Sequence, residues 1–345
     1  MLFCVEQLIS VLRNTPSITV PIGFIHDLLA AVKDPVKRRG LIGKVGIAPV
    51  LLEEGSARVT AEQFSTLYRL VARELDDELP GMLSRPARGG AFKLLCLSML
   101  ESANLRIAVY RLSRFMRLIC DDFSVELTQQ GELVRVAMVP AEGAPAITVF
   151  AQEVMLKLIH GVVSWLAGRK MHLARVDFCY SRPEHASVYA FLYPGPANFD
   201  QAQTALYFES KDLDAPVRQS KKTLTDFLWR APADWLFVSF SEHIVSHHVR
   251  EYLEKHLDSP TSITEVAKAL HFSVRTLFRR LDAEGATFQA IKDELRRDVA
   301  IQRLTKTDTP IAVIGAEIGF DDPTTFHRAF KKWTGSTPGA YRPKR

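Results

Sequence analysis

A short pattern occurs twice in the last hundred residues, and it constrains the fold more than any other feature of the chain. The first copy, from Ser262 to Gly285, reads SITEVAKALHFSVRTLFRRLDAEG, and the second, from Thr309 to Gly335, reads TPIAVIGAEIGFDDPTTFHRAFKKWTG. The offset between equivalent apolar positions is 48 to 49 residues, as Leu270, Leu277 and Leu281 align with Ile318, Phe326 and Phe330. Because each copy reads as helix, tight turn and helix, the repeat predicts two helix-turn-helix motifs, over about 262–283 and 310–333.

The first copy carries a start or stop signal at each expected boundary. Ser262 and Glu265 have the S-x-x-E spacing of a capping box. His271 occupies the turn, where histidine tolerates a left-handed backbone better than most residues do. Ser273 can cap the next helix, and Gly285 can end it.

The second copy has equivalent signals made from different residues. Pro310 marks the start of its first helix, and Gly319 is free to take a positive φ in the turn. Asp322 is the expected cap of the second helix. Gly315 falls where the first copy has Ala267, and a glycine inside a helix costs up to about 1 kcal/mol against alanine, so close packing must offset it.

The second helix of each copy presents basic and polar side chains once its apolar face is turned inward. Arginine can donate two hydrogen bonds to guanine, so Arg279 and Arg328, at equivalent positions, are the strongest candidates for base contacts. Phe278 can contact a thymine methyl group, and His327 can donate to a base or a phosphate. The residues assigned to phosphate contacts, which fix position without reading sequence, are Ser273, Thr276, Arg280, Lys331 and Lys332. The alternative is a solvated basic helix face, although its occurrence twice after a helix-turn favours DNA binding.

Composition limits the number of domains and the classes of protein to which the chain can belong. The 345 residues suffice for two or three domains, and 47% hydrophobic content is ordinary for a globular protein. The net charge is only +5, and the chain from Ser241 onward has 17 basic and 14 acidic residues, so the placement of charges matters more than their sum. The longest apolar stretch, Val154 to Gly168, includes Lys157 and His160 and is expected to be too short and too interrupted for a bilayer.

The ends of the chain and its cysteines favour a protein of the cytoplasm. The first ten residues read as the start of a helix rather than as a secretion signal. The four cysteines are far apart and form no CxxC pair, so reduced thiols are expected. No metal site, no cofactor and no membrane partner are predicted.

Within the first two hundred residues, the pattern of apolar and polar residues changes near position 122. Helical periodicity dominates before it, whereas residues 123–140 alternate around a Gln-Gly turn as a β-hairpin does. A helix is expected from Ala151 to about Ala167, followed by three strand-like runs, RVDFCYS, ASVYAFLY and QTALYFES. This region is therefore predicted to be α+β, with a small, mostly antiparallel sheet, and the Pro-containing and charged residues 214–233 to connect it to an all-α domain.

The last hundred residues closely resemble the DNA-binding domain of the AraC/XylS family of bacterial transcription regulators. The resemblance rests on SVRTLFRRLDAEG, on the residues from Phe288 to Leu304, on IGAEIGFDDPTTFHRAFKKWTGSTP and on the final Ala-Tyr-Arg. It implies that a long helix carrying Leu295, Arg296, Ala300 and Leu304 joins the two motifs, and that both recognition helices enter successive major-groove segments. The base-contact positions that it implies are Arg275, Phe278 and Arg279, then Thr324, His327 and Arg328, with Phe278 where a polar residue is common.

Residues 175–217 also resemble an arabinose-binding-like effector domain found in part of that family. Tyr180 stands where histidine is expected and Thr204 where asparagine is expected. The resemblance implies a sensor and, in many relatives, a dimerisation surface, without identifying arabinose as the ligand. The predicted organisation is an effector domain over 1–215, a linker over 216–240 and a DNA-binding domain over 241–345.

A small-molecule pocket needs apolar walls and a few placed polar groups. Six residues of the strand-like region can supply both: Arg175, Phe178, Tyr180, His185, Tyr189 and Tyr193. The alternative is that these are ordinary strand residues that pack a sheet.

Three classes of function compete. The first is a cytoplasmic, nucleoid-associated transcription regulator, a ligand-responsive activator whose partners are double-stranded DNA, RNA polymerase, a small-molecule effector and a second copy of the chain. The second is a DNA-binding domain fused to an alkyl-transfer enzyme, which needs a reactive cysteine. The third is an architectural DNA binder that senses nothing. Footprinting with and without ligand separates the first from the third, and zinc analysis with thiol reactivity tests the second.

Overall fold

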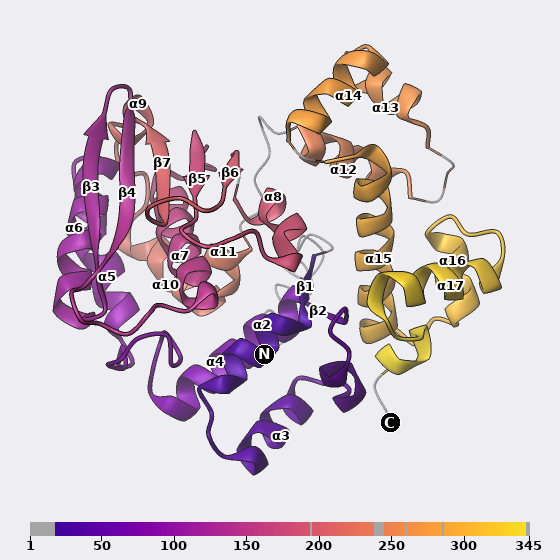
Figure 1. Cartoon of the computed structure of the whole chain (residues 1–345), viewed down its shortest axis with the longest axis horizontal. Helices are drawn as coiled ribbons and strands as arrows, with labels where there is room; N and C mark the ends of the chain where they lie inside the picture. The colour runs from indigo at the N-terminus through magenta and orange to yellow at the C-terminus, as the bar shows by residue number, and fades with distance from the viewer. Residues whose placement is uncertain are drawn as a thin grey trace. The chain divides into compact units, whose positions relative to one another are not determined.

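The computed structural model describes residues 18–193, 195–237, 245–257, 259, 261–284 and 286–342. Contacts within these residues divide the chain into two compact units, each named here after its longest helix (Figure 1). The α7 unit contains residues 23–45 and 62–247. The α15 unit contains residues 1–22, 46–61 and 248–345, so two segments from the beginning of the chain belong with its end.

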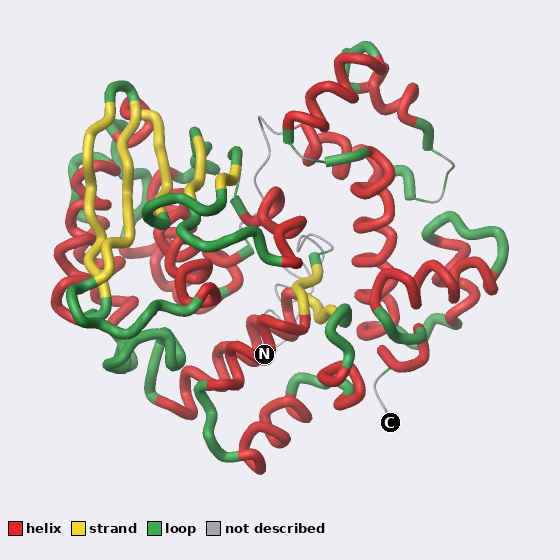
Figure 2. Tube along the Cα trace, in the orientation of Figure 1, coloured by secondary structure: helices red, strands yellow, loops and turns green. Residues whose placement is uncertain are grey.

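A five-stranded mixed sheet lies in the α7 unit, with strand order β3-β4-β7-β5-β6 (Figure 2). The strands are β3 (Phe123–Gln130), β4 (Leu133–Pro140), β5 (Arg175–Asp177), β6 (Ala197–Asn198) and β7 (Ala205–Glu209). Neighbours are antiparallel except β5 and β6, which are parallel. The predicted hairpin is confirmed, since β3 and β4 pair from Phe123 opposite Pro140 to Gln130 opposite Leu133. The predicted α+β class is therefore confirmed as well.

Helices pack against this sheet, with α6 along β3 and α7 along β7. Those before the hairpin are α2 (Ile22–Ala30), α3 (Pro35–Lys44), α4 (Ala61–Leu75), α5 (Ala91–Leu100) and α6 (Leu105–Ile119). The helix α6 begins where Asn104 accepts a hydrogen bond from the Ile107 N–H at 2.9 Å. Those after it are α7 (Val149–Ala167), η2 (Glu184–Val188), α8 (Tyr189–Leu192), α9 (Ser210–Leu213), α10 (Lys221–Arg230) and α11 (Ala233–Leu236).

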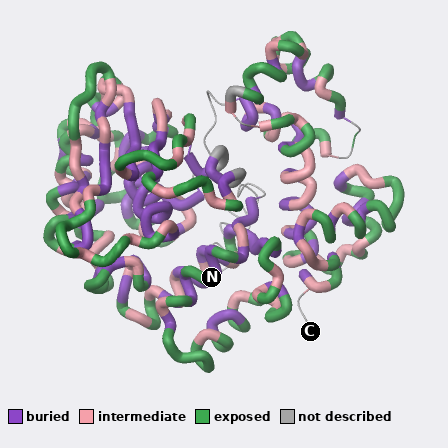
Figure 3. The backbone as a smooth tube through the Cα atoms, in the orientation of Figure 1, coloured by how far each residue is buried: buried purple, intermediate pink, exposed green. Residues whose placement is uncertain are grey.

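The helix α7 is longer than the sequence suggested. It begins at Val149, where Thr148 caps it, and its 19 residues are long and apolar enough to cross a membrane by length and composition. The expectation that this stretch is too short was therefore wrong. In the structure, however, 89% of its apolar window is buried inside the protein, so α7 is placed as the core helix of its unit (Figure 3).

The run ASVYAFLY is helical, and the predicted strand at this position was wrong. Residues 184–192 form the short helices η2 and α8. The alternation of aromatic and small residues also fits a spacing of four, which puts His185, Tyr189 and Tyr193 on one helical face. The other two runs are confirmed in shortened form, as β5 and β7.

The residues expected to connect the domains contain two helices that pack in the α7 unit. The ring of Phe227 on α10 stacks on Trp165 of α7, with centroids 4.3 Å apart and planes 7° apart. Trp235 of α11 is buried, and the centroid of its ring lies 6.1 Å from that of the Tyr68 ring. Whether the chain folds as separate domains with boundaries near 215 and 240 stays a prediction.

The α15 unit is mainly helical, as predicted for the end of the chain. Its helices are α12 (Val245–Lys255), α13 (Ile263–Ala269), α14 (Val274–Ala283), α15 (Phe288–Lys306), α16 (Ile311–Glu317) and α17 (Pro323–Thr334), followed by η3 (Pro338–Tyr341). Three short elements from the other end of the chain join them: β1 (Thr19–Pro21), η1 (Pro49–Glu53) and β2 (Arg58–Thr60). The strands β1 and β2 pair antiparallel, and β2 contacts α15.

A buried ionic network holds this strand pair to α15. The Thr19 hydroxyl donates to Asp298 Oδ1 at 2.5 Å, and Arg58 Nε donates to the same hydroxyl oxygen at 2.8 Å. Asp298 also pairs with Arg250 at 3.0 Å and with Arg297 at 3.1 Å. Because Asp298 is only 4% exposed, these partners offset the cost of burying its charge.

Candidate nucleic-acid interface

The first helix-turn-helix motif consists of α13 and α14, and its predicted signals are confirmed. Ser262 Oγ accepts from the Glu265 N–H at 3.3 Å, and Glu265 Oε2 accepts from the Ser262 N–H at 2.7 Å. His271 has a left-handed φ of 58° in the turn. Ser273 Oγ accepts from the Thr276 N–H at 3.1 Å and so begins α14.

The second motif consists of α16 and α17, and it reaches the same geometry with other residues. Gly319 takes a φ of 81° in the turn, where a side chain would be strained. Asp322 accepts from the hydroxyl and the N–H of Thr325, which lowers the pKa of its carboxyl and keeps the cap ionised. A Cβ at Gly315 would lie 3.1 Å from the Phe326 ring, so the expected close packing is present.

Both recognition helices, α14 and α17, bury the apolar residues that the repeat predicted. The side chains of Leu277, Leu281, Phe326 and Phe330 are all at most 1% exposed. The predicted base-contact residues all lie on exposed positions: Arg275, Phe278, Arg279, Thr324, His327 and Arg328. Phe278 is 53% exposed, so its ring is accessible for contact with another surface. Gly285, the predicted end of the first recognition helix, lies outside the described residues.

The predicted phosphate contacts lie beside these positions. Arg280, Lys331 and Lys332 are exposed, while Thr276 is half-buried and Ser273 is exposed at the start of α14. The Arg280 guanidinium lies over the Phe272 ring at 4.5 Å, which holds it near the turn. Within the described residues, Arg275, Arg279 and Arg328 form no ion pair with a carboxylate, so their guanidinium groups can meet an outside anion.

The helix α15 joins the two motifs, as the family resemblance implied. Leu295, Ala300 and Leu304 are fully buried along it. Arg296 lies over the Phe320 ring at 5.1 Å and donates to the Gly319 carbonyl at 3.2 Å. Arg296 therefore braces the turn of the second motif, a role that no sequence pattern indicated.

In the α7 unit, five of the six predicted effector residues lie together around Glu153. His185 Nε2 lies 2.8 Å from Glu153 Oε1, and the Tyr189 hydroxyl donates to the same oxygen. The Tyr180 and Tyr189 hydroxyls are 3.1 Å apart, and the Tyr193 hydroxyl donates to the Glu153 carbonyl at 2.9 Å. Phe178 completes the cluster, with its ring centroid 4.9 Å from that of Tyr189. The sixth residue, Arg175, instead lies over the Tyr207 ring at 3.9 Å.

Sequence reasoning missed the two charged residues of α7 that this cluster surrounds. Glu153 is 3% exposed and Lys157 is 2% exposed. Lys157 donates to the Leu192 carbonyl at 2.7 Å, and burial lowers its pKa to about 7. Opposite charges four residues apart in a largely apolar helix were the signal that could have indicated them.

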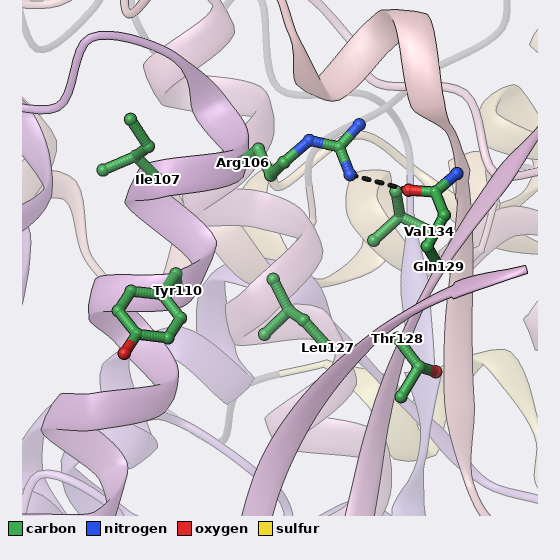
Figure 4. A pocket seen from close by; sticks show the side chains of 7 residues that line it. All are labelled: Arg106, Ile107, Tyr110, Leu127, Thr128, Gln129 and Val134. Atoms are coloured by element: carbon green, nitrogen blue, oxygen red, sulfur yellow. Dashed lines mark hydrogen bonds between the residues drawn. The ribbon is translucent and has the colours of Figure 1, made fainter.

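A pocket of about 330 Å³ lies between α6 and the β3-β4 hairpin (Figure 4). Its walls include Ile107, Tyr110 and Leu127. Arg106 at its edge donates to Gln129 Oε1 at 2.9 Å and pairs with Asp214 at 2.9 Å. None of the predicted effector residues lines this pocket.

The cysteines of the described residues are free thiols, and none lies in a metal-binding cluster there. No group of three His, Cys, Asp or Glu side chains that could hold a metal occurs in that part of the chain. Cys96 and Cys120 are buried, and burial raises the pKa of the Cys96 thiol to about 12. Cys179 is exposed, and Cys4 lies outside the described residues.

Comparison with known proteins places these features in one family. Residues 36–217, more than half of the chain, match the model described as the arabinose-binding domain of AraC transcription regulator, N-term. Residues 266–344 match a helix-turn-helix domain model. The chain belongs to the AraC family of transcription regulators. This AraC-family regulator therefore combines a helix-turn-helix DNA-binding part with an N-terminal ligand-binding domain, which confirms the resemblance.

The chain is also similar to individual proteins of known name. The regulator is 28% identical over 326 residues to the Ornithine utilization regulator of Pseudomonas aeruginosa, covering 94% of this chain and 96% of that protein. It is 29% identical over 147 residues to the Transcriptional activator NphR of Rhodococcus sp, covering 40% of this chain and 44% of NphR. The solved structure of transcriptional regulator CdpR from Pseudomonas aeruginosa covers 93% of this chain and 97% of its own, at 19% identity and a TM-score of 0.32.

Proposed function

We propose that this regulator reads promoter DNA with α14 and α17, each in one of two successive major-groove segments. The observation that carries the proposal is the equivalence of the two helices, which bury matching apolar faces and leave matching arginines exposed. Base contacts are assigned to Arg275, Phe278, Arg279, Thr324, His327 and Arg328. Phosphate contacts are assigned to Ser273, Thr276, Arg280, Lys331 and Lys332.

Replacing Lys332 by alanine is expected to weaken binding to all DNA sequences alike, since a phosphate contact carries no sequence information. The slope of log affinity against log salt should become shallower by about 1. Affinity titrations on promoter and unrelated duplexes between low and high salt measure both effects. Lys222→Ala, an exposed lysine on α10, serves as the control and should leave the slope unchanged. Selective loss of promoter binding in Lys332→Ala would instead assign that residue to base reading.

The regulator responds to a small-molecule effector and activates transcription through contact with RNA polymerase. The match to an arabinose-binding domain supports the sensing part, and the name of the Pseudomonas relative, a regulator of ornithine utilisation, favours an amino-group-bearing effector. The name of NphR, a transcriptional activator, favours activation. As a promoter-binding protein of a bacterial regulator family, it acts in the cytoplasm at the nucleoid.

The regulator forms a homodimer through the α7 unit. Several of its large apolar side chains are exposed on the helices α5, α6 and α10, namely Leu94, Ile107, Tyr110, Leu118 and Trp229. Exposed apolar side chains mark an interaction surface where they form one contiguous patch. Sedimentation that finds a strict monomer, with and without DNA, would reject the dimer.

Regulation, rather than catalysis, is the proposed activity of the whole chain. An alkyl-transfer enzyme needs a thiol that ionises readily, whereas burial raises the pKa of Cys96 and Cys120. Footprinting of the promoter of its own gene, across a panel of metabolites, tests the proposal. Protection that changes with a metabolite supports a ligand-responsive regulator, and protection that never changes supports an architectural DNA binder.

A further inference from the structure

The buried side of α7 carries a carboxylate and an ammonium group one helical turn apart. Glu153 and Lys157 are four residues apart, so both lie on one face of the helix. Their side chains are nevertheless partnered by other groups, Glu153 by His185 and Tyr189, and Lys157 by the Leu192 carbonyl. Beside the buried polar residues Gln152, His160 and Ser164, α7 therefore contains a buried carboxylate and a buried amino group that are bound by other groups.

Burying a carboxylate and an ammonium group in this helix costs free energy of folding. Removing a carboxylate and an ammonium from water costs more than packing apolar side chains of similar volume at the same places. Charges retained at this cost, in the domain that belongs to a ligand-binding family, are candidates for recognition of a ligand.

One segment supplies the partners of both charges. The helices η2 and α8, together residues 184–192, contribute His185 and Tyr189 to Glu153 and the Leu192 carbonyl to Lys157. His185 contributes a ring nitrogen 2.8 Å from the carboxylate, and its side chain is 27% exposed. These groups occupy the two positions that a ligand cation and a ligand anion would take.

Aromatic rings form the walls around these positions. The Phe24 ring meets His185 edge-on at 5.2 Å, and the Phe178 ring lies 4.9 Å from Tyr189. The Lys157 ammonium lies 5.7 Å from the centroid of the Tyr193 ring. Aromatic faces attract ammonium groups, and they favour a site in which a carboxylate supplies the counter-charge.

We propose that this face of α7 binds an amino acid, whose ammonium group pairs with Glu153 in place of His185 and whose carboxylate pairs with Lys157 in place of the Leu192 carbonyl. Binding displaces residues 184–192 from the face, which gives the effector a conformational effect. The proposal rests on the proposed function, since it names the effector class of the sensing domain.

The two charges explain why the ligand class is an amino acid. A simple amine pairs with Glu153. However, once residues 184–192 are displaced, Lys157 loses the Leu192 carbonyl and gains no anion in its place. A simple carboxylate satisfies Lys157 but leaves Glu153 without a cation. Only a molecule that carries both charges replaces both sets of protein contacts.

Calorimetric titration of the full chain, without DNA, tests the proposal. The probes are the twenty common amino acids and L-ornithine, with butylamine and pentanoate as single-charge analogues. At least one amino acid is expected to bind, and both single-charge analogues are expected to bind at least tenfold more weakly. Glu153→Gln and Lys157→Met should each lower the affinity at least tenfold. Glu184→Gln, on the same segment but exposed, is the matched control and should leave it unchanged.

A second variant keeps the test decisive if Glu153→Gln or Lys157→Met does not fold. Replacing His185 by alanine removes the group that competes for Glu153, so it should tighten amino-acid binding several-fold, which a purely structural role for His185 would not do. The proposal is overturned if no amino acid binds the parent at about 1 mM, the upper end of typical substrate KM values, or if an analogue with one charge binds equally well. It is also overturned if His185→Ala binds no more tightly. Promoter binding is measured separately, because its loss would contradict the proposed function whether or not an amino acid binds.

Discussion

Replacing Asp298 by alanine is expected to destabilise the α15 unit by about 3–5 kcal/mol, the usual cost of removing one partner from a buried ion pair. The carboxylate is 4% exposed and accepts from Thr19, Arg250 and Arg297. Without it, two guanidinium groups stay largely buried with no counter-charge. Urea unfolding, with hydrogen exchange of the α15 backbone amides as the readout, measures the loss of stability in this unit.

The matched control is Asp293→Ala on the same helix. Asp293 accepts a hydrogen bond from Gln289 Nε2 at 2.9 Å and is not one of the residues that bind Asp298. Its replacement should change the free energy of unfolding by about 0.5 kcal/mol or less. If the two substitutions had equal effects, the network around Asp298 would not be what holds β1 and β2 to α15.

The same network predicts how stability depends on pH. Burial alone would raise the pKa of Asp298, but Arg297, Arg250 and Arg58, with the Thr19 hydroxyl, outweigh it and lower that pKa below its usual value. A pKa that is lower in the folded state stabilises the protein above the unfolded value, about 3.9 for aspartate. This contribution is therefore complete at neutral pH and is lost as the pH falls through the folded-state pKa. Asp298→Asn should remove that part of the acid sensitivity, and an unchanged acid transition would contradict the shift.

Replacing Arg279 or Arg328 by alanine is expected to weaken promoter binding by about 1–3 kcal/mol, the discrimination of one bidentate arginine–guanine contact. Both guanidinium groups are exposed on recognition helices whose inner faces are buried. Because the two residues lie in separate motifs, the losses should be additive in the double variant. Competition titrations with promoter variants measure the affinity and show which base position is relaxed by each substitution.

Arg303→Ala provides the control for these substitutions. Arg303 is an exposed arginine on α15 that pairs with Glu317 at 3.6 Å and belongs to neither recognition helix. Its removal should leave the preference among promoter variants unchanged. If Arg279→Ala retained the base preference of the parent, the assignment of α14 to the groove would be wrong.

The helix-turn-helix motifs could be predicted because their signals are local. The caps at Ser262, Ser273 and Asp322 and the left-handed turns at His271 and Gly319 each depend on residues only a few positions apart. The helices η2 and α8 could not, since alternating aromatic residues fit a strand as well as a helical face that packs on α7.

Long-range contacts set the limit of the sequence analysis. Thr19 and Asp298 are 279 positions apart, and nothing near either residue indicates the other. The strand pair β1-β2 therefore joins the α15 unit without a local signal. Glu153 was missed for a different reason. Its significance comes from the residues that cover it, and the run that contains Tyr189 was predicted to be a strand.

The most direct test of the account is the protection of guanine N7 from methylation across the promoter, because this atom is the one that a recognition-helix arginine covers in the major groove. The parent is expected to protect two groups of guanines about one helical turn, roughly 10 base pairs, apart. Arg279→Ala should expose only one group and Arg328→Ala only the other. Protection of a single group by the parent, or retention of both groups by either variant, would contradict the claim that both helices read the duplex.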